Sequence, residues 1–203
     1  MSNCSKVADI LNNCNSANLN LISGVVVARK EAVNVTPNAT NAFLMDEVLI
    51  IDPDTGAYPV TGSAYMPIKM EWVYNSVKQN YEVVEGVSTF DRFKHTIGKV
   101  VISNSEKAVA KQSIKALNTQ MWVVIAKSKG VDAPEDSFSI FGLQNGMKFV
   151  PEATSDEVGG RVQGSFMSIA GGEESTPNGV NWLKTDYDTT NTLYNQRLNP
   201  VIV

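Results

Sequence analysis

The chain has 203 residues, of which 43% are hydrophobic and 19% charged, and its formal net charge is −4 at pH 7. This length suffices for one domain with a substantial core and no disulfide staples. The acidic balance argues against a protein that grips nucleic acid by neutralising phosphates. Because charge is sparse, we expect partners to cover part of the surface.

Eight runs rich in β-branched and aromatic residues predict strands. In chain order they are residues 22–28, 43–51, 67–74, 81–87, 97–102, 121–127, 138–142 and 162–170. The clearest run is 67–74, where Ile68 and Met70 alternate with Lys69 and Glu71, so we expect it to line the core. The predicted fold class is mainly β, a β-sandwich or barrel.

One helix is predicted beside the strands, near residues 104–119. Ser103 and Glu106 form a capping box at its start. An apolar stripe then recurs at helical spacing, at Ala110, Ile114, Leu117 and Met121. Lys107, Lys111 and Lys115 follow an adjoining stripe, which is typical of a solvated helix face. We expect the helix to flank the sheet through its apolar stripe.

The sequence predicts three regions: an N-terminal arm at 1–20, a β-sandwich domain at 21–170 and an extended C-terminal arm at 171–203. Long loops are expected at 30–41 and 52–66, where periodicity is weak. The C-terminal arm is too apolar for a solvated linker, and it follows no evident period. It must lie across a surface, either its own or that of a neighbouring subunit. We predict the second, with an assembly role for Trp182, Leu183, Tyr187, Tyr194 and Leu198.

The residues for catalysis and metal binding are few. His95 is the one histidine, and Asp91 could orient its ring, but the chain has no G-x-S-x-G nucleophile turn. We therefore expect a structural or surface histidine. Cys4 and Cys14 are the two cysteines, and with one distant histidine they cannot supply four spaced zinc ligands. We predict no enzymatic activity, no cofactor and no metal.

Two further stretches look like binding loops at first sight. The run from Asp52 to Gly56 begins like a calcium loop, but it lacks the later ligands, and a turn is the better interpretation. The run from Gly159 to Gly164 is rich in glycine but lacks the G-K-[ST] ending of a phosphate loop. Its glycines are interpreted as conformationally permissive backbone positions where a strand begins.

Two longer stretches carry a resemblance to a known group of proteins. They are FSIFGLQNGMK at 138–148 and GRVQGSFMSIAGGEE at 160–174. Together they resemble virion structural proteins of phages that infect Bacteroidetes, with the crAss-like phages as one candidate group. In that group a strand with a Gly-hydrophobic-x-Asn-Gly turn is followed by a Gly-led strand that ends in Gly and Glu. The long C-terminal arm departs from this pattern.

The expected architecture is also similar to that of phage tail-tube proteins, in which a β-sandwich or barrel with one flanking helix forms stacked rings. The resemblance implies a tail-tube-like or tail-ring subunit that oligomerises into a DNA conduit. Its expected partners are copies of itself and other tail or connector proteins, with DNA only as passing cargo and no membrane. We expect it in the phage tail or neck of the virion, and in the host cytoplasm during assembly.

Two alternatives are carried forward. The first is a head decoration or head-to-tail connector protein, which would form trimers or bind a capsid rather than close a ring. The second is a carbohydrate-binding β-sandwich, since Trp72, Trp122 and Trp182 could stack on sugar rings. Trp72 and Trp122 lie in predicted strands, which leaves Trp182 as the candidate exposed platform.

Overall fold

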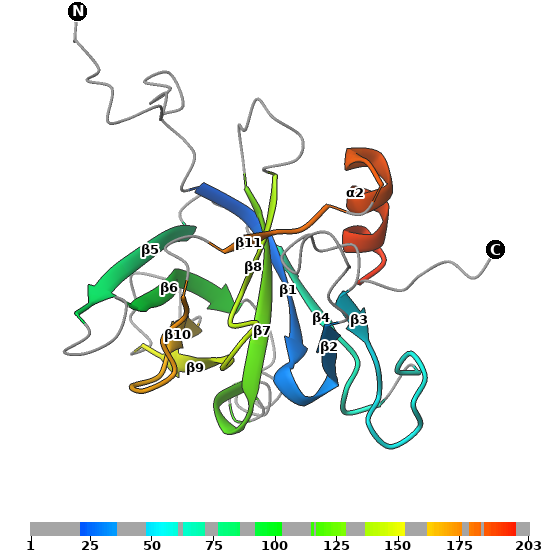
Figure 1. The fold of residues 1–203 in the computed structure, drawn as a ribbon, viewed down its shortest axis with the longest axis horizontal. Helices are drawn as coiled ribbons and strands as arrows, with labels where there is room; N and C mark the ends of the chain where they lie inside the picture. The colour runs from blue at the N-terminus through cyan, green and yellow to red at the C-terminus, as the bar shows by residue number, and fades with distance from the viewer. Residues whose placement is uncertain are drawn as a thin grey trace, which may run out of the picture.

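The structure is a computed structural model that describes residues 21–35, 48–60, 63–71, 77–85, 92–102, 115, 117–128, 137–152, 162–175, 179–183 and 185–197. Its elements, in chain order, are β1 Leu21–Arg29, the 3-10 helix η1 Lys30–Ala32, β2 Val33–Val35, β3 Val48–Ile50, β4 Ile68–Glu71, β5 Val77–Val84, β6 Arg92–Ile102, β7 Met121–Ser128, β8 Phe138–Phe141, β9 Met147–Pro151, β10 Val162–Ser168, β11 Val180–Asn181 and α2 Tyr187–Asn195 (Figure 1). The predicted mainly-β class is confirmed.

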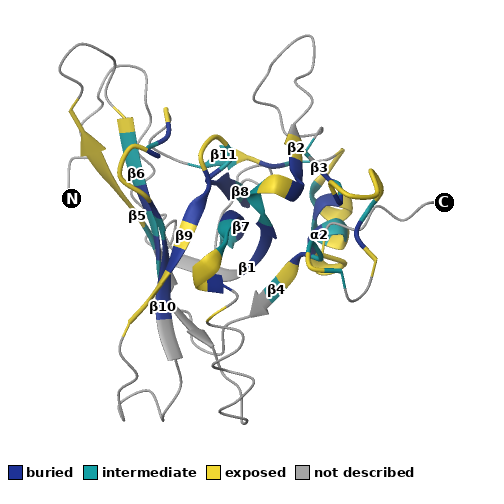
Figure 2. Ribbon diagram, turned by 90° about the horizontal axis from the view of Figure 1, so that it is seen from below, coloured by how far each residue is buried: buried dark blue, intermediate teal, exposed yellow. Residues whose placement is uncertain are grey.

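The strands form two layers, which are joined at two corners by strand pairing. One layer contains β4, β1, β7, β8 and β11, and the other contains β5, β6, β10 and β9 (Figure 2). β1 reaches the second layer by pairing with β5 at Leu21 and Ile22, and β7 does so by pairing with β9 at Met121 and Trp122. Each corner consists of two residue pairs, so short ladders join the layers at their edges; the structure is not a closed barrel.

The first core fills the space between the two layers. Val25, Val27 and Val124 contribute from one layer, and Phe149 and Phe166 from the other, with the two phenylalanine rings 5.1 Å apart. All five side chains are fully buried. Alternate residues of each strand point into this space, as expected for a sandwich.

A second core lies on the opposite face of β1 and β7. Val26, Ala28, Val123 and Ile125 are buried there beneath β2, β3 and α2. As a result β1 is buried on both faces from Val25 to Ala28, which explains its continuous apolar run.

Some predicted elements differ from the observed ones. The stretch 67–74 was expected to line the core, but β4 lies next to β1 at the end of its layer and its Ile68 is 38% exposed. The strands β2, β9 and β11 were not predicted. Of the predicted helix near 104–119, the described residues are Lys115, which is exposed, and Leu117–Thr119, of which Leu117 is buried as the apolar stripe requires. The N-terminal arm at 1–20 lies outside the described residues.

Residues of the C-terminal arm form a helix, although no periodicity was recognised there. Asp186 caps α2, because its carboxylate accepts hydrogen bonds from the backbone N–H and the hydroxyl of Thr189, at 2.7 and 3.2 Å. These bonds hold the pKa of Asp186 below its usual value. Thr190 and Tyr194 form the buried side of α2, so the helix is a third layer over the sheet.

Candidate assembly surface

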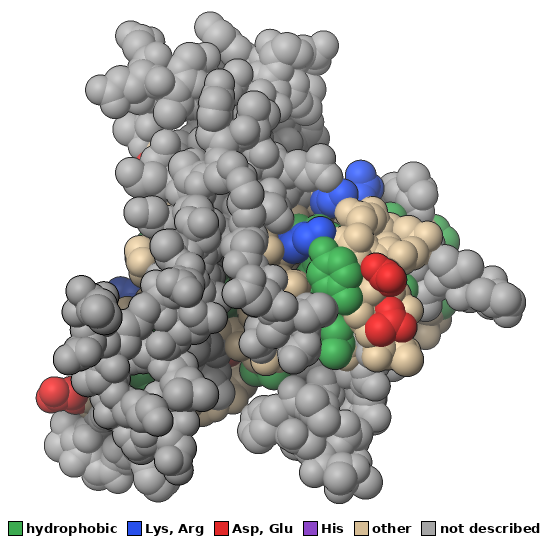
Figure 3. Space-filling model, turned by 90° about the horizontal axis from the view of Figure 1, so that it is seen from above, with side chains coloured by type: hydrophobic (Ala, Val, Ile, Leu, Met, Phe, Trp, Pro, Cys, Tyr) green, Lys and Arg blue, Asp and Glu red, His purple; other side chains and the backbone are tan. Residues whose placement is uncertain are grey.

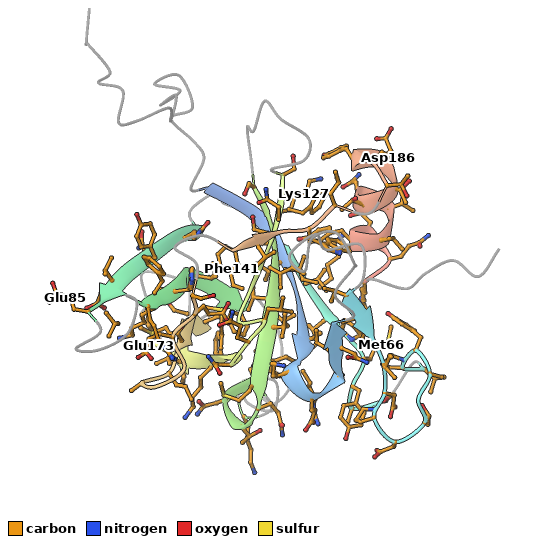
Figure 4. All side chains as sticks on the ribbon, viewed as in Figure 1. Met66, Glu85, Lys127, Phe141, Glu173 and Asp186 are labelled. Carbon is orange, nitrogen blue, oxygen red and sulfur yellow. The ribbon has the colours of Figure 1, made fainter. Side chains whose placement is uncertain are left out.

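Within the described residues, the outer edge of β5 is unpaired over most of its length. On one side β5 pairs with β6 from Lys78 to Val84. On the other side β1 pairs with Val77 and Lys78 alone, and no strand among the described residues pairs with this edge from Gln79 onward. The strand ends beside Glu85, at the left of the molecule (Figure 4). An unpaired row of backbone N–H and C=O groups can receive a further strand.

Apolar side chains are exposed along this edge. Tyr81 is 53% exposed and Val83 is 48% exposed. Tyr81 packs edge-on against the half-buried Phe93, with 5.9 Å between the ring centroids. Val83 lies directly opposite Phe93 in the β5–β6 ladder, and directly opposite residues share a face. The row therefore continues the core-facing side of β6 beyond the part that the other layer covers.

The same edge lacks the usual protection against strand addition. Between Gln79 and Val84 the sequence holds no proline and no lysine, and its one charged residue is Glu82. Glu82 lies 3.9 Å from Lys94, a long and solvent-exposed ion pair that contributes little stability. Natural edge strands are commonly protected by lysine, proline or a bulge. By this criterion the β5 edge is suited to binding another strand.

A second free edge lies at the opposite end of the same layer, on β9. β10 pairs with β9 on one side over the whole strand, whereas β7 covers the other side at Met147 and Lys148 alone. Within the described part of the chain, no strand covers this side of β9 from Phe149 to Pro151. Val150 is 40% exposed there. As far as the described strands show, the layer β5–β6–β10–β9 therefore ends in an unpaired edge at each side.

The two stretches that carried the family resemblance contact each other in space. The turn between β8 and β9 has Gly142 and Gly146 at positive φ, and at Gly142 a Cβ would lie 2.7 Å from Met147 Cγ. This turn is bound to the turn after β10 by two contacts: Gln144 N–H donates to the Glu174 carboxylate at 3.0 Å, and Asn145 Nδ2 donates to the Glu173 carbonyl at 3.1 Å. The two stretches thus form one structural unit.

The turn after β10 is itself tightly hydrogen-bonded. Glu173 accepts a hydrogen bond from Gly171 N–H at 3.0 Å, and backbone N–H groups hold the pKa of Glu173 below its usual value. Glu174 is buried, and its backbone bridges to Phe93 of β6. Glu173 and Glu174 therefore bind the turn after β10 to the turn between β8 and β9, and Glu174 also binds it to β6.

His95 is buried in the first core. It is 1% exposed, its backbone N–H donates to Ser168 Oγ at 3.0 Å, and its ring lies 5.4 Å from that of Phe141. His95 is therefore not a surface residue.

The Asp52 turn is confirmed. The two carboxylate oxygens of Asp52 accept hydrogen bonds from Asp54 N–H and from the Ser63 hydroxyl, both at 2.9 Å, so the carboxylate organises its own loop. Over the residues that the structure describes, no three His, Cys, Asp or Glu side chains are grouped as a metal site.

The predicted assembly arm requires a correction. Trp182 is 4% exposed and lies edge-on to Phe138 at 6.0 Å, and Tyr194 is equally buried in the second core. Leu183 and Tyr187 are half-buried, and Tyr187 also packs on Phe138, whereas Leu198 lies outside the described residues. Trp182 and Tyr194 thus cover the chain's own sheet and are not available as anchors on a neighbouring subunit.

The same burial removes Trp182 as an exposed platform for sugar rings, and Trp122 is buried as well. Trp72 lies outside the described residues. On the face that Figure 3 shows, apolar, basic and acidic side chains of the described residues adjoin one another.

Comparisons with protein-family models, curated proteins and solved structures gave no significant match. Among the described helices, none is long and apolar enough to cross a membrane.

Proposed function

We propose that this chain is a structural subunit that assembles with copies of itself, and that it is a phage virion protein of the tail-tube or tail-ring kind. In this role it would form a ring through which DNA passes. The observation that carries the proposal is the β5 edge, with which no described strand pairs from Gln79 onward and which is lined by the exposed side chains of Tyr81 and Val83.

An edge of this kind has a physical use when another strand pairs with it. Strand addition satisfies the backbone groups of both strands and buries the side chains along the edge. Val83 is 48% exposed, so covering the rest of it is worth about half of the roughly 1.5–3 kcal/mol that full burial of such a side chain contributes. Tyr81 adds a large, rigid ring, a type of side chain that is enriched among the residues that dominate binding energy. An assembling subunit would bury both Val83 and Tyr81 against the added strand.

The resemblance to virion proteins of phages that infect Bacteroidetes supports the narrower proposal. The two stretches behind it form one hydrogen-bonded unit through Gln144, Asn145, Glu173 and Glu174. A mainly-β sandwich with a helix layer is also compatible with a tail-tube subunit, although fold alone does not imply function. The corresponding partners are further copies of the chain and other tail or connector proteins.

The test is sedimentation velocity of the purified chain over a range of concentrations, followed by negative-stain electron microscopy of the largest species. We expect concentration-dependent oligomers and annular particles with a central channel. Trimers without a channel would favour a head decoration or connector protein instead. A monomer at every concentration, together with absence from particles produced in an infected host, would refute the proposal.

A further inference from the structure

We propose that the free edge of β5 in one copy pairs with the free edge of β9 in a second copy. The layer β5–β6–β10–β9 would then continue from one subunit into the next. This inference rests on the proposed function, because it names the surfaces through which the copies join.

The strand directions favour this pairing. β5 is antiparallel to β6, β6 to β10 and β10 to β9, so β5 and β9 run in opposite directions. A second copy, placed alongside by rotation about an axis parallel to the strands, keeps the direction of its own β9. That strand therefore meets β5 as an antiparallel neighbour, which is the more stable arrangement per residue.

The free lengths of the two strands limit the register. β9 offers Phe149–Pro151, because β7 already occupies the edge at Lys148. Core-facing residues must pair with core-facing residues, since a shift by one residue would reverse the faces. The register whose ladder stops at Val83, one residue before the end of β5, places Val83 opposite Phe149 and Tyr81 opposite Pro151. Val84 must leave the ladder in this register, because Lys148 of the other copy is already paired with Met121 of its β7.

The side chains suit this register. The exposed Val83 and Tyr81 meet apolar residues on the core-facing side. On the opposite face Glu82 lies opposite Val150 and diagonal to Lys148 of the other copy, within reach of a long side chain. The Glu82 carboxylate and the Lys148 ammonium group carry opposite charges, so they attract each other across the interface at the end of the ladder. Pro151 lacks an N–H group, which keeps the ladder short.

The two other candidates for the β5 edge fit less well. Antiparallel pairing of two β5 edges centred on Glu82 would place this carboxylate opposite its own copy, and like charges directly opposite are unfavourable. Extending the β1–β5 register, in which Leu21 pairs with Lys78, to residues 16–20 would place Asn18 opposite Tyr81. A polar amide there leaves the apolar row without an apolar partner.

Joining two different edges has a consequence for assembly. The contact is heterologous, and heterologous contacts build closed rings or open filaments rather than isolated dimers. The β5–β9 pairing is therefore the kind of interface that a ring or tube requires, whereas a β5–β5 contact would end at a dimer.

Cysteine cross-linking tests the pairing directly. In a background in which Cys4 and Cys14 are replaced by serine, one protein carries Glu82→Cys and another carries Val150→Cys. Directly opposite residues of an antiparallel pair have Cα atoms about 4.5–5.5 Å apart, within the range of a disulfide. We expect a disulfide-linked dimer in the oxidised mixture and none with either protein alone. Asn80→Cys mixed with Val150→Cys is the register control and should cross-link less.

The other outcomes overturn the inference in distinguishable ways. A cross-link formed by Glu82→Cys alone would show that two β5 edges pair. Failure of the mixture to cross-link, while sedimentation still shows oligomers, would refute the β5–β9 pairing and leave the proposed function standing. A protein that stays monomeric under all conditions would refute both.

Discussion

Replacing Trp182 by alanine should destabilise the fold rather than the assembly. Trp182 is 4% exposed and belongs to the second core, where its ring lies edge-on to that of Phe138 with 6.0 Å between the centroids. The backbone N–H of Trp182 donates to the Phe138 carbonyl at 2.9 Å. A tryptophan of this kind buries up to about 250 Å². At about 25 cal/mol per Å² this burial is worth at most about 6 kcal/mol, and measured tryptophan-to-alanine substitutions in cores cost about 3–5 kcal/mol. This loss is a large share of the stability of a typical domain.

The assay is urea denaturation followed by circular dichroism, at a protein concentration low enough that the wild type is monomeric. We expect Trp182→Ala to lower the free energy of unfolding by about 3–5 kcal/mol. The neighbouring half-buried residue gives the matched control, Leu183→Ala, which should cost less. If Trp182→Ala changed monomer stability by less than about 1 kcal/mol while abolishing oligomers, the arm would be an intersubunit element after all and the reasoning would fail.

Three further outcomes follow from the packing and the caps. Gly164→Ala should cost about 1–3 kcal/mol in denaturant titrations, because the new Cβ would overlap Cζ of the buried Phe149 ring; wild-type stability would contradict this. Leu117→Asp should unfold the domain at ordinary temperature while Lys115→Glu leaves the melting temperature unchanged, and equal melting temperatures would show that the helix face is misassigned. Asp186 has a lowered pKa, so its capping contribution is present above the unfolded pKa near 3.9 and is lost as pH falls through the folded value. The stability difference between wild type and Asp186→Asn should therefore diminish in acid, and a constant difference down to about pH 2 would contradict the assignment.

The sequence predicted the strands with strong apolar or β-branched character and missed the weaker ones. β1 and β7 are continuous apolar runs because both of their faces are buried. β9 has the alternation of a half-buried strand, with Met147 and Phe149 buried and Lys148 exposed, but it is short and ends in Pro151. A run of this length beside a glycine turn is ambiguous without its partners.

The helix α2 was missed for a physical reason. Its sequence is rich in Thr, Asn and Asp, which have low intrinsic helix propensity. The available signal was the cap at Asp186 followed by Tyr187, Thr190 and Tyr194 at steps of three and four residues. Recognising this pattern would have placed the arm on the chain's own sheet, because such a stripe needs an apolar face to cover.

The candidate assembly surface could be anticipated only in part. The run 81–87 was predicted as a strand, and the sequence shows that it holds few charges. Whether Tyr81 and Val83 are covered depends on where the other layer ends, which is set by pairings between residues far apart in the chain, such as Leu21 with Lys78. Such long-range pairings cannot be read from local periodicity.

The most direct test of the central claim is the oligomeric state of a variant with a blocked β5 edge. Tyr81→Lys combined with Val83→Lys places two cations along the edge, a device that natural edge strands use against pairing. Val60→Lys is the control, because Val60 is the most exposed of the large apolar side chains described and lies on a loop. In sedimentation velocity, we predict that the wild type and Val60→Lys associate while the double variant stays folded and monomeric. Its melting temperature should fall only modestly, because it loses the Tyr81 contact with Phe93 within the subunit. Oligomers of the double variant equal in size and abundance to those of the wild type would contradict the claim.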